Sequence, residues 1–438
     1  MRSLLLLLFT WAATASLAAQ GYTSFFTGDT TDVVTDHQFG IVLGGGGQDN
    51  DDAMQWMLAR AQGGDVVILR ESGSDGYNDY FFSELGVSVN SVETILFNDA
   101  VGAQDAYVIR RIREAEVLFI AGGDQTVYFD YWRDSPVQEA LDYLVNEKAV
   151  TIGGTSAGMA ILGGAVYAPE DLGVTSDEAL ADPFDPYMDS IQVGGLVSLP
   201  FLDSTLTDTH FENRNRQGRT FTLLARLSDA YSGPAYAIAC NNATAVTIDP
   251  TGRATVYGEF PEFGDYAFFM QINCASTPPG PENLTPGQPL TWDRAGAAVK
   301  VYRVPGLTTP ANYFELSDWT TGNGGSWQNW SVTNGVLNID PNGAEPECTP
   351  VATRRDPLPW PGLVLAPQPA GTELRLLNTA PDVRFERLEI RNLEGRLLRR
   401  LDSGSRSWSV AGLPAGTYEL LLQDAEGRSG ALVFVVGR

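Results

Sequence analysis

The stretch Val150-Thr151-Ile152-Gly153-Gly154-Thr155-Ser156-Ala157-Gly158 predicts a short buried strand that runs through a turn of small residues into an apolar helix, Met159-Ala160-Ile161-Leu162. Its pattern Gly154-x-Ser156-x-Gly158 is typical of a nucleophile elbow, a sharp strand-to-helix turn that exposes a serine hydroxyl. The glycines relieve the crowding that such a turn creates. We therefore expect Ser156 to be a nucleophile and the amide of Ala157 to face the oxyanion of a tetrahedral intermediate.

Short apolar strands and helices alternate on the N-terminal side of this turn. We expect strands at 38–43, 65–69, 91–97, 117–121 and 149–152, with helices between them at 53–61, 103–113 and 137–146. This alternation predicts a parallel sheet covered by helices on both faces. Ligands bind such sheets beyond the carboxyl ends of the strands. The second oxyanion donor should therefore come from Gly122-Gly123, and Gly123 is our candidate.

A serine nucleophile needs a base, and the chain has only two histidines. His37 lies in a polar segment before the first strand, whereas His210 opens a helical stretch, so we expect His210 to be the base. The alternative is that His210 only caps that helix. For the acid that orients the base we favour Glu170 over Asp171, because both follow the elbow helix and the strand 165–167 toward the same edge of the sheet.

Three motifs, in the same order along the chain, resemble the cyanophycinase and dipeptidase E family of serine peptidases. They are Gly154-Thr155-Ser156-Ala157-Gly158, Gly122-Gly123-Asp124-Gln125 and Asp208-x-His210-Phe211-x-x-Arg214-x-Arg216-x-x-Arg219. The resemblance covers about residues 38–306 and implies a flavodoxin-like α/β fold, as in class I glutamine amidotransferases. It implies Ser156 as nucleophile, His210 as base and an acid after the elbow. It also implies a substrate pocket formed by Gln125, Asp208, Arg214, Arg216 and Arg219.

One departure from the family limits what the resemblance implies. Thr209 stands where cyanophycinases carry glutamine, so hydrolysis of the aspartate–arginine polymer itself is in doubt. The arginines, in a chain short of cations, favour recognition of a carboxylate. On a regular helix Arg214 would lie about 200° round from Arg216, so all of them can serve one ligand only if the first turn is irregular. The alternative is a structural ion pair between Glu212 and Arg216.

The composition limits the class of partner and the compartment. Residues 1–19 have the basic start, short apolar run and small-residue exit of a secretory signal peptide. No later stretch predicts a membrane span, and a formal net charge of -26 disfavours nucleic acid and anionic membranes as partners. We expect no organic cofactor and no metal, since two distant histidines and scattered cysteines do not suit zinc. Whether Cys240 pairs with Cys274 is left open, and around Asp49 a helix start is favoured over a calcium site.

The C-terminal third has a different sequence pattern. Residues 307–362 are expected to be an extension with a Pro-rich linker, and residues 363–438 alternate apolar and polar positions as in a small β-sandwich. Leu365-Ala366-Pro367-Gln368-Pro369 and Leu413-Pro414-Ala415-Gly416-Thr417-Tyr418 resemble the sorting domain of the type IX secretion system, although Gln368 stands where that family usually has asparagine. The resemblance implies that this secretion machinery is a partner. The alternative is a stalk or adhesion module.

Together these features predict an exported serine peptidase whose catalytic domain spans residues 20–306. We expect it to hydrolyse peptide or isopeptide bonds in small acidic peptides. A general serine esterase is the enzymatic alternative, but the α/β-hydrolase class places its histidine later in the chain. A binding module that keeps the elbow only as architecture is the non-catalytic alternative.

Overall fold

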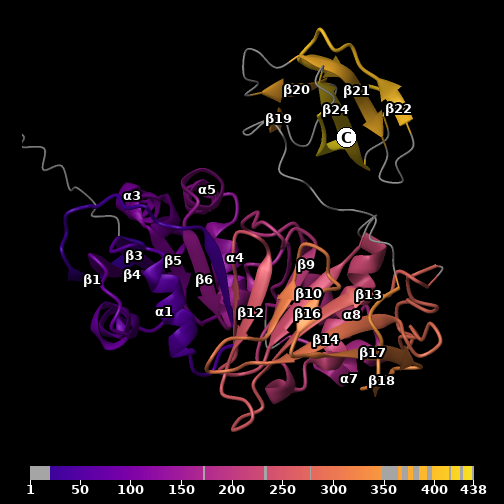
Figure 1. Ribbon diagram of the computed structural model, residues 1–438, viewed down its shortest axis with the longest axis horizontal. Coiled ribbons are helices and arrows are strands. Elements are labelled where there is room, and N and C mark those ends of the chain that lie inside the picture. Colours follow the sequence, from indigo (N-terminus) through magenta and orange to yellow (C-terminus); the bar gives the residue numbers. More distant parts are fainter. Residues whose placement is uncertain are drawn as a thin grey trace, which may run out of the picture.

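The computed structural model describes residues 20–170, 173–230, 234–276 and 278–347, and in the C-terminal region 364–366, 373–377, 384–391, 397–413, 416–424 and 428–436. The expected signal peptide, Asp171 and the linker residues 348–363 lie outside the described residues. The described chain forms two large sheets that lie side by side and a smaller all-β unit at the C-terminus (Figure 1).

The first sheet is built on parallel strands in the order β4-β3-β5-β6-β2. The strands are β2 (Gly40–Gly44), β3 (Asp65–Arg70), β4 (Ser91–Phe97), β5 (Val117–Ile120) and β6 (Thr151–Thr155). If β3 is counted as strand 1 and the later strands are numbered along the chain, the run β4-β3-β5-β6 has the order 2-1-3-4, which begins the flavodoxin order 2-1-3-4-5. The fifth place is taken by β2, which precedes β3 in the chain. The Gly-rich turn after β2 and the serine turn after β6 therefore meet at one edge of the sheet.

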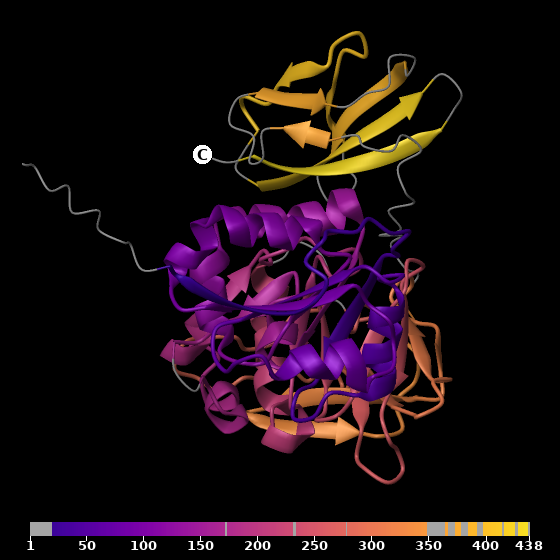
Figure 2. The ribbon, with the colours of Figure 1, turned by 90° about the vertical axis from the view of Figure 1, so that its left-hand side faces the viewer.

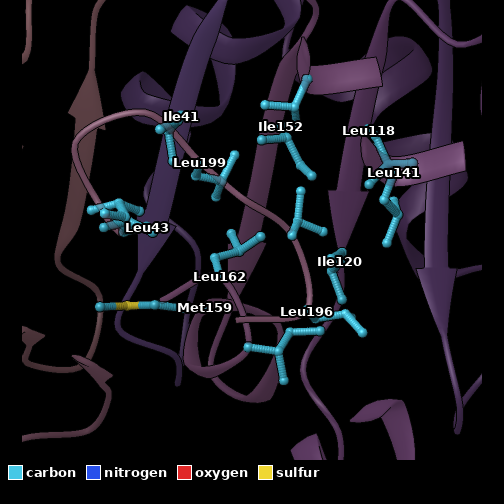
Figure 3. Packing of buried hydrophobic residues seen from close by; sticks show 14 of the residues in the cluster. Ile41, Leu43, Leu118, Ile120, Leu141, Ile152, Met159, Leu162, Leu196 and Leu199 are labelled. Carbon is cyan, nitrogen blue, oxygen red and sulfur yellow. The ribbon is translucent and has the colours of Figure 1, made fainter. Parts of the chain in front are cut away.

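Helices cover both faces of these parallel strands, because successive strand residues point to opposite sides. The helix α1 (Asp51–Ala59) packs Met57 and Leu58 against Val42 and Phe119 on one face. On the other face Ile41, Leu118 and Ile152 form one layer with Leu141 of α5 (Pro136–Tyr143), as Figure 3 shows. The α/β fold predicted from the sequence is thus confirmed.

Antiparallel strands extend this sheet at both ends. They are β1 (Tyr22–Gly28) beside β4 and, beyond β2, β11 (Ala245–Ile248), β12 (Arg253–Tyr257), β15 (Tyr313–Glu315) and β16 (Gly322–Asn323).

A second sheet, which the sequence did not predict, has the order β18-β17-β14-β13-β10-β9-β7-β8. Its strands are β7 (Ala165–Tyr167), β8 (Ile191–Val193), β9 (Thr205–Asp208), β10 (Tyr236–Cys240), β13 (Tyr266–Ile272), β14 (Val299–Pro305), β17 (Ser326–Thr333) and β18 (Val336–Asp340). The helix α8 (Gln217–Ala230) packs with α7 (Ser176–Ala181) beside it. Because β15 pairs with β12 and β17 pairs with β14, the segment expected as an extension contributes to both sheets.

The C-terminal unit consists of two antiparallel sheets that pack face to face (Figure 2). One contains β19 (Val364–Ala366), β20 (Glu373–Leu377) and β23 (Ser407–Ser409). The other contains β22 (Leu397–Arg400), β21 (Phe385–Arg391), β24 (Gly416–Asp424) and β25 (Ser429–Val436). Leu374, Ile390 and Leu420 lie in a core of its own. The predicted small β-sandwich is confirmed, while its role in sorting stays a prediction.

Cys240 and Cys274 do not pair. Cys240 is free and buried, whereas Cys274 is disulfide-bonded. Cys240 lies opposite Ala267 in the antiparallel pair of β10 and β13, and Cys274 follows seven residues later. At a rise of about 3.4 Å per residue the two sulfurs sit near opposite ends of the strand pair, well beyond the reach of a disulfide.

Across the described residues, the structure holds no helix that combines the length and apolar character needed to cross a membrane.

Candidate active site

The serine turn has the strained geometry that its sequence predicts. Ser156 joins β6 to α6 (Ala157–Ala160) with φ 53° and ψ -119°, a conformation that costs a non-glycine residue free energy. A side chain at Gly158 would place its Cβ 2.0 Å from the carbonyl oxygen of Ile120, and one at Gly154 would lie 2.5 Å from Gly158. Gly158 is therefore needed for the turn to pack against β5, and Gly154 is needed for the turn to close on itself.

Ser156 meets His210 across the junction of the two sheets. Ser156 Oγ lies 2.8 Å from Nε2 of His210, which is buried directly after β9. The backbone amides of Ser156 and His210 donate to the carbonyl oxygens of Gly44 and Gly45, at 3.0 and 2.8 Å. The loop after β2 thus holds the two side chains in register.

Asn242, and not Glu170, contacts the other nitrogen of the base. His210 Nδ1 lies 2.5 Å from Oδ1 of Asn242, in the turn between β10 and β11. Glu170 is exposed, and the carbonyl of its neighbour Pro169 accepts a hydrogen bond from Thr126 Oγ1 at 2.6 Å, which fixes this segment on the start of α4 (Gln125–Trp132). The prediction that Glu170 orients His210 is therefore wrong. Asp171, the other candidate, lies outside the described residues.

The pairing of strands in the second sheet explains how Asn242 reaches the base. The strands β9 and β10 are parallel neighbours, with Asp208 opposite Ala239, so their carboxyl ends lie together. The residues after β10 therefore reach the base that follows β9. The sequence alone does not single out Asn241-Asn242, because two asparagines between apolar strands are typical of an ordinary turn.

The electrostatic surroundings keep the base neutral. Burial lowers the pKa of His210, and the charges of Arg214 and Arg216 lower it further. The hydrogen bond with Asn242 and the charge of Asp208 act in the opposite direction without reversing the shift. A neutral imidazole is the form that can accept a proton from Ser156.

Gly122 and Gly46 border Ser156, whereas the glycine expected there from the sequence was Gly123. A Cβ at Gly122 would lie 3.4 Å from Ser156 Cβ, and a Cβ at Gly46 would lie 2.9 Å from the same atom. A Cβ at Gly123 would instead meet Glu71 Oε1 at 2.2 Å. Gly122 is therefore the nearer neighbour of the nucleophile, while Ala157 follows Ser156 directly. The oxyanion roles of Gly123 and Ala157 stay predictions.

A small pocket with a cavity volume of about 10 Å³, room for about one water molecule, is lined by Gln125, Tyr167, Asp208, Arg216 and Arg219 among others, and also by Thr209, the residue before His210. Arg219 makes a two-pronged contact with Asp208, Nη2 to Oδ1 at 2.7 Å and Nε to Oδ2 at 3.2 Å. Burial favours a raised pKa for Asp208, but Arg219 and Arg216 outweigh it and hold that pKa below its usual value. The positive charge of Arg219 is therefore already balanced by the carboxylate of Asp208.

The other two arginines are less occupied. Nη1 of Arg216 donates to the carbonyl and the hydroxyl of Thr209 at 2.9 and 3.1 Å, and burial lowers the pKa of Arg216 to about 10. Arg214 lies on the irregular turn Glu212–Arg214 before α8, is exposed, and makes no ion pair with any residue that the structure describes. The ion pair between Glu212 and Arg216, which was the structural alternative, does not form, and Glu212 pairs instead with Arg303 at 3.2 Å.

The acidic residues around the start of α1 are engaged in local contacts. Tyr77 donates to Asp49 at 2.5 Å, and Tyr80 donates to Asp51 at 2.7 Å. Oδ1 of Asn50 caps the helix by accepting from the amide of Ala53. Over the part of the chain that is described, no group of three or more His, Cys, Asp or Glu side chains could hold a metal ion.

Comparison with known proteins gives no matching family model. The chain is 28% identical over 144 residues to a cyanophycinase of Geminocystis herdmanii (strain PCC 6308), which covers 33% of this chain and 48% of that protein. It is 28% identical over 211 residues to a cyanophycinase of Synechococcus elongatus, 46% of this chain and 61% of that protein. The chain thus spans about half to three-fifths of the length of these curated relatives.

Among solved structures, a peptidase from an acI-B1 Actinobacterium aligns with 53% of this chain and 94% of its own, at a TM-score of 0.37 and 13% identity. The fold assignment does not depend on this weak likeness. The sequence matches, in contrast, are to cyanophycinases, the class of protein that the three motifs predicted. They confirm the resemblance of this chain to the cyanophycinase and dipeptidase E family.

Proposed function

We propose that this protein is a serine peptidase that hydrolyses a peptide or isopeptide bond in small acidic peptides. The observation that carries the proposal is the 2.8 Å contact between Ser156 Oγ, on a strained elbow, and Nε2 of a buried histidine. An unstrained serine turn would serve for architecture alone, so the strain favours catalysis. The similarity to cyanophycinases supports hydrolysis of an amide bond.

In this proposal Ser156 Oγ attacks the scissile carbonyl and gives its proton to Nε2 of His210. The amide of Ala157 and a second amide from the Gly122-Gly123 turn stabilise the oxyanion. The imidazolium then protonates the leaving amine, which departs and leaves an acyl-enzyme. Water, deprotonated by His210, hydrolyses that ester and restores the serine.

The surroundings of the pair support an acidic substrate. The exposed Arg214 lies close enough to His210 to lower its pKa, and the partly buried Arg216 lines the adjoining pocket. Nη1 of Arg216 also pairs with Asp208, at 3.5 Å, but both guanidinium groups retain donors for a ligand, whereas Arg219 is held by Asp208 through two of its nitrogens. We assign carboxylate binding to Arg214 and Arg216, and we assign to Arg219 the task of fixing Asp208 beneath them.

A test of the mechanism is labelling with a fluorophosphonate, which reacts only with an activated serine. The wild-type protein should be labelled at Ser156 and should hydrolyse acidic dipeptides or isopeptides from a substrate library. Ser156→Ala should lose both labelling and turnover, and His210→Ala nearly as much, because the two act as a unit. The matched control is Ser83→Ala, which removes an exposed hydroxyl far along the chain from the site. Turnover that survives in Ser156→Ala would disprove the serine mechanism.

A further inference from the structure

Asn242 is held in place from several directions. Its backbone amide donates to Oδ1 of Asn213 at 2.8 Å, and the next amide, that of Ala243, donates to the carbonyl of Gly46 at 3.0 Å. The preceding Asn241 donates to both Glu212 and the carbonyl of Gly264 at 2.8 Å. The turn is thus tied to the segment after His210 and to the loop beside Ser156, which leaves the Asn242 side chain little freedom.

We propose that Asn242 is the positioning residue of the active site, and that its amide oxygen holds His210 in the tautomer that carries the proton on Nδ1. The proposal rests on the proposed function, since it concerns the base of that reaction. An amide oxygen accepts only from a protonated Nδ1, and a neutral imidazole carries a single proton. Nε2 is then left with the lone pair that must take the proton of Ser156.

The amide differs from a carboxylate in what it does to the base. Arg214 and Arg216 face His210 with positive charge, and Asp208, whose charge Arg219 balances, is the negative group near it. The hydrogen bond with Asn242 raises the pKa of His210, but Asn242 adds a dipole and no charge, so the imidazolium that forms during catalysis gains less from it than it would from a carboxylate. We therefore expect the base to stay neutral, and the enzyme active, to a lower pH than a serine–histidine–carboxylate arrangement would allow.

The chain is well suited to a direct measurement, because it has only two histidines. In full-length protein with ¹⁵N-labelled histidine, the chemical shifts of the ring nitrogens report which one carries the proton. His37 Nε2 lies 2.8 Å from the carbonyl of Lys148, so it must donate, and its buried Nδ1 makes no hydrogen bond with any residue that the structure describes. We expect His37 to be protonated on Nε2 and His210 on Nδ1, with His37→Gln assigning the two signals.

Variants at position 242 separate positioning from mere structure. Asn242→Ala should lower kcat about ten- to a hundredfold with little change in KM, because it removes one hydrogen bond to a group that becomes charged. Asn242→Asp should keep activity at pH 8 but raise the acidic limb of kcat/KM by about one to three pH units, because a carboxylate stabilises the imidazolium. The matched control Asn338→Asp adds the same charge at an exposed site on β18 and should shift nothing.

A His210 signal protonated on Nε2 in the wild-type protein would overturn the proposal, because Asn242 would then be donating to the ring. An unchanged kcat in Asn242→Ala, in protein whose thermal unfolding is unaltered, would do the same. The tautomer is measured on the resting protein, so it decides the role of Asn242 independently of turnover. Failure of the proposed function shows differently, as a wild-type Ser156 that no fluorophosphonate labels.

Discussion

Each arginine near the base has a different environment, although sequence alone makes them look equivalent. Arg219 is buried against Asp208, Arg216 is shared between Thr209 and the pocket, and Arg214 is exposed. Removing one partner of a buried ion pair destabilises a protein by about 3–5 kcal/mol. Losing an exposed charge costs stability little, so its effect should appear in binding.

We predict that Arg214→Ala lowers kcat/KM about ten- to a hundredfold on a peptide with a free carboxylate, since a hydrogen bond to a charged group contributes about 1.5–3 kcal/mol. The same variant should act normally on the matching amide. Arg219→Ala should instead lower the thermal unfolding temperature and affect both substrates alike. Arg110→Ala, which removes an exposed arginine from the helix Ala106–Glu114, is the control. Equal losses on acid and amide in Arg214→Ala would leave no reason to favour acidic peptides.

At the scale of elements, the site depends on the loop Gly44–Gly47 after β2. Its carbonyls accept from the amides of Ser156 and His210, and it accepts again from Ala243 in the turn that carries Asn242. Both Ser156 and His210 have positive φ values, 53° and 47°, which cost free energy unless the surroundings impose them. One loop therefore fixes all members of the site, and it can do so because β2 lies next to β6.

This loop gives a prediction. A Cβ at Gly46 would lie 2.5 Å from Nε2 of His210 and 2.9 Å from Cβ of Ser156, and Gly46 has φ +90°. Gly46→Ala should therefore separate the pair and lower the rate of fluorophosphonate labelling by at least about tenfold, since small misplacements of reacting groups have large effects. Gly76→Ala, where the added methyl group meets nothing within 4 Å, should label at the wild-type rate. Labelling of Gly46→Ala at the wild-type rate would show that the loop accommodates the methyl group without moving Ser156 away from His210.

The alternation of strands and helices predicted the parallel sheet and the serine turn correctly, because local patterns determine both. Three features escaped because they depend on contacts between distant segments. The place of β2 beside β6 cannot be read from strands that are separated by more than a hundred residues. The second sheet contains antiparallel strands as far along as Val336–Asp340, in a segment that looked like an extension. Asn242 reaches His210 only because β10 pairs with β9.

At the scale of the whole molecule, the C-terminal sandwich differs in net charge from the rest of the chain. The C-terminal residues 363–438 hold ten arginines against nine acidic residues, a net charge of +1, so the rest of the chain carries -27 of the total of -26. The C-terminal sandwich also has a hydrophobic core of its own, apart from the clusters that support the two sheets. Separate cores indicate that the unit does not stabilise the active site. We propose that it serves export, together with a signal peptide at residues 1–19.

The last prediction follows from that division. Protein recovered outside the cells of its natural host should begin near Gln20 and lack most residues after about Leu363, because the signal peptide and the sandwich would both be removed on passage. Deleting 363–438 should leave hydrolysis and thermal unfolding of the remaining chain nearly unchanged, since no residue of the site comes from the sandwich, but should keep the protein inside the cell. The control is a deletion of residues 1–19 alone, which should leave the chain in the cytoplasm with the sandwich intact. N-terminal sequencing and mass spectrometry of the extracellular fraction decide the matter. Wild-type chain found intact and only in the cytoplasm would remove both the export route and the separate role of the sandwich.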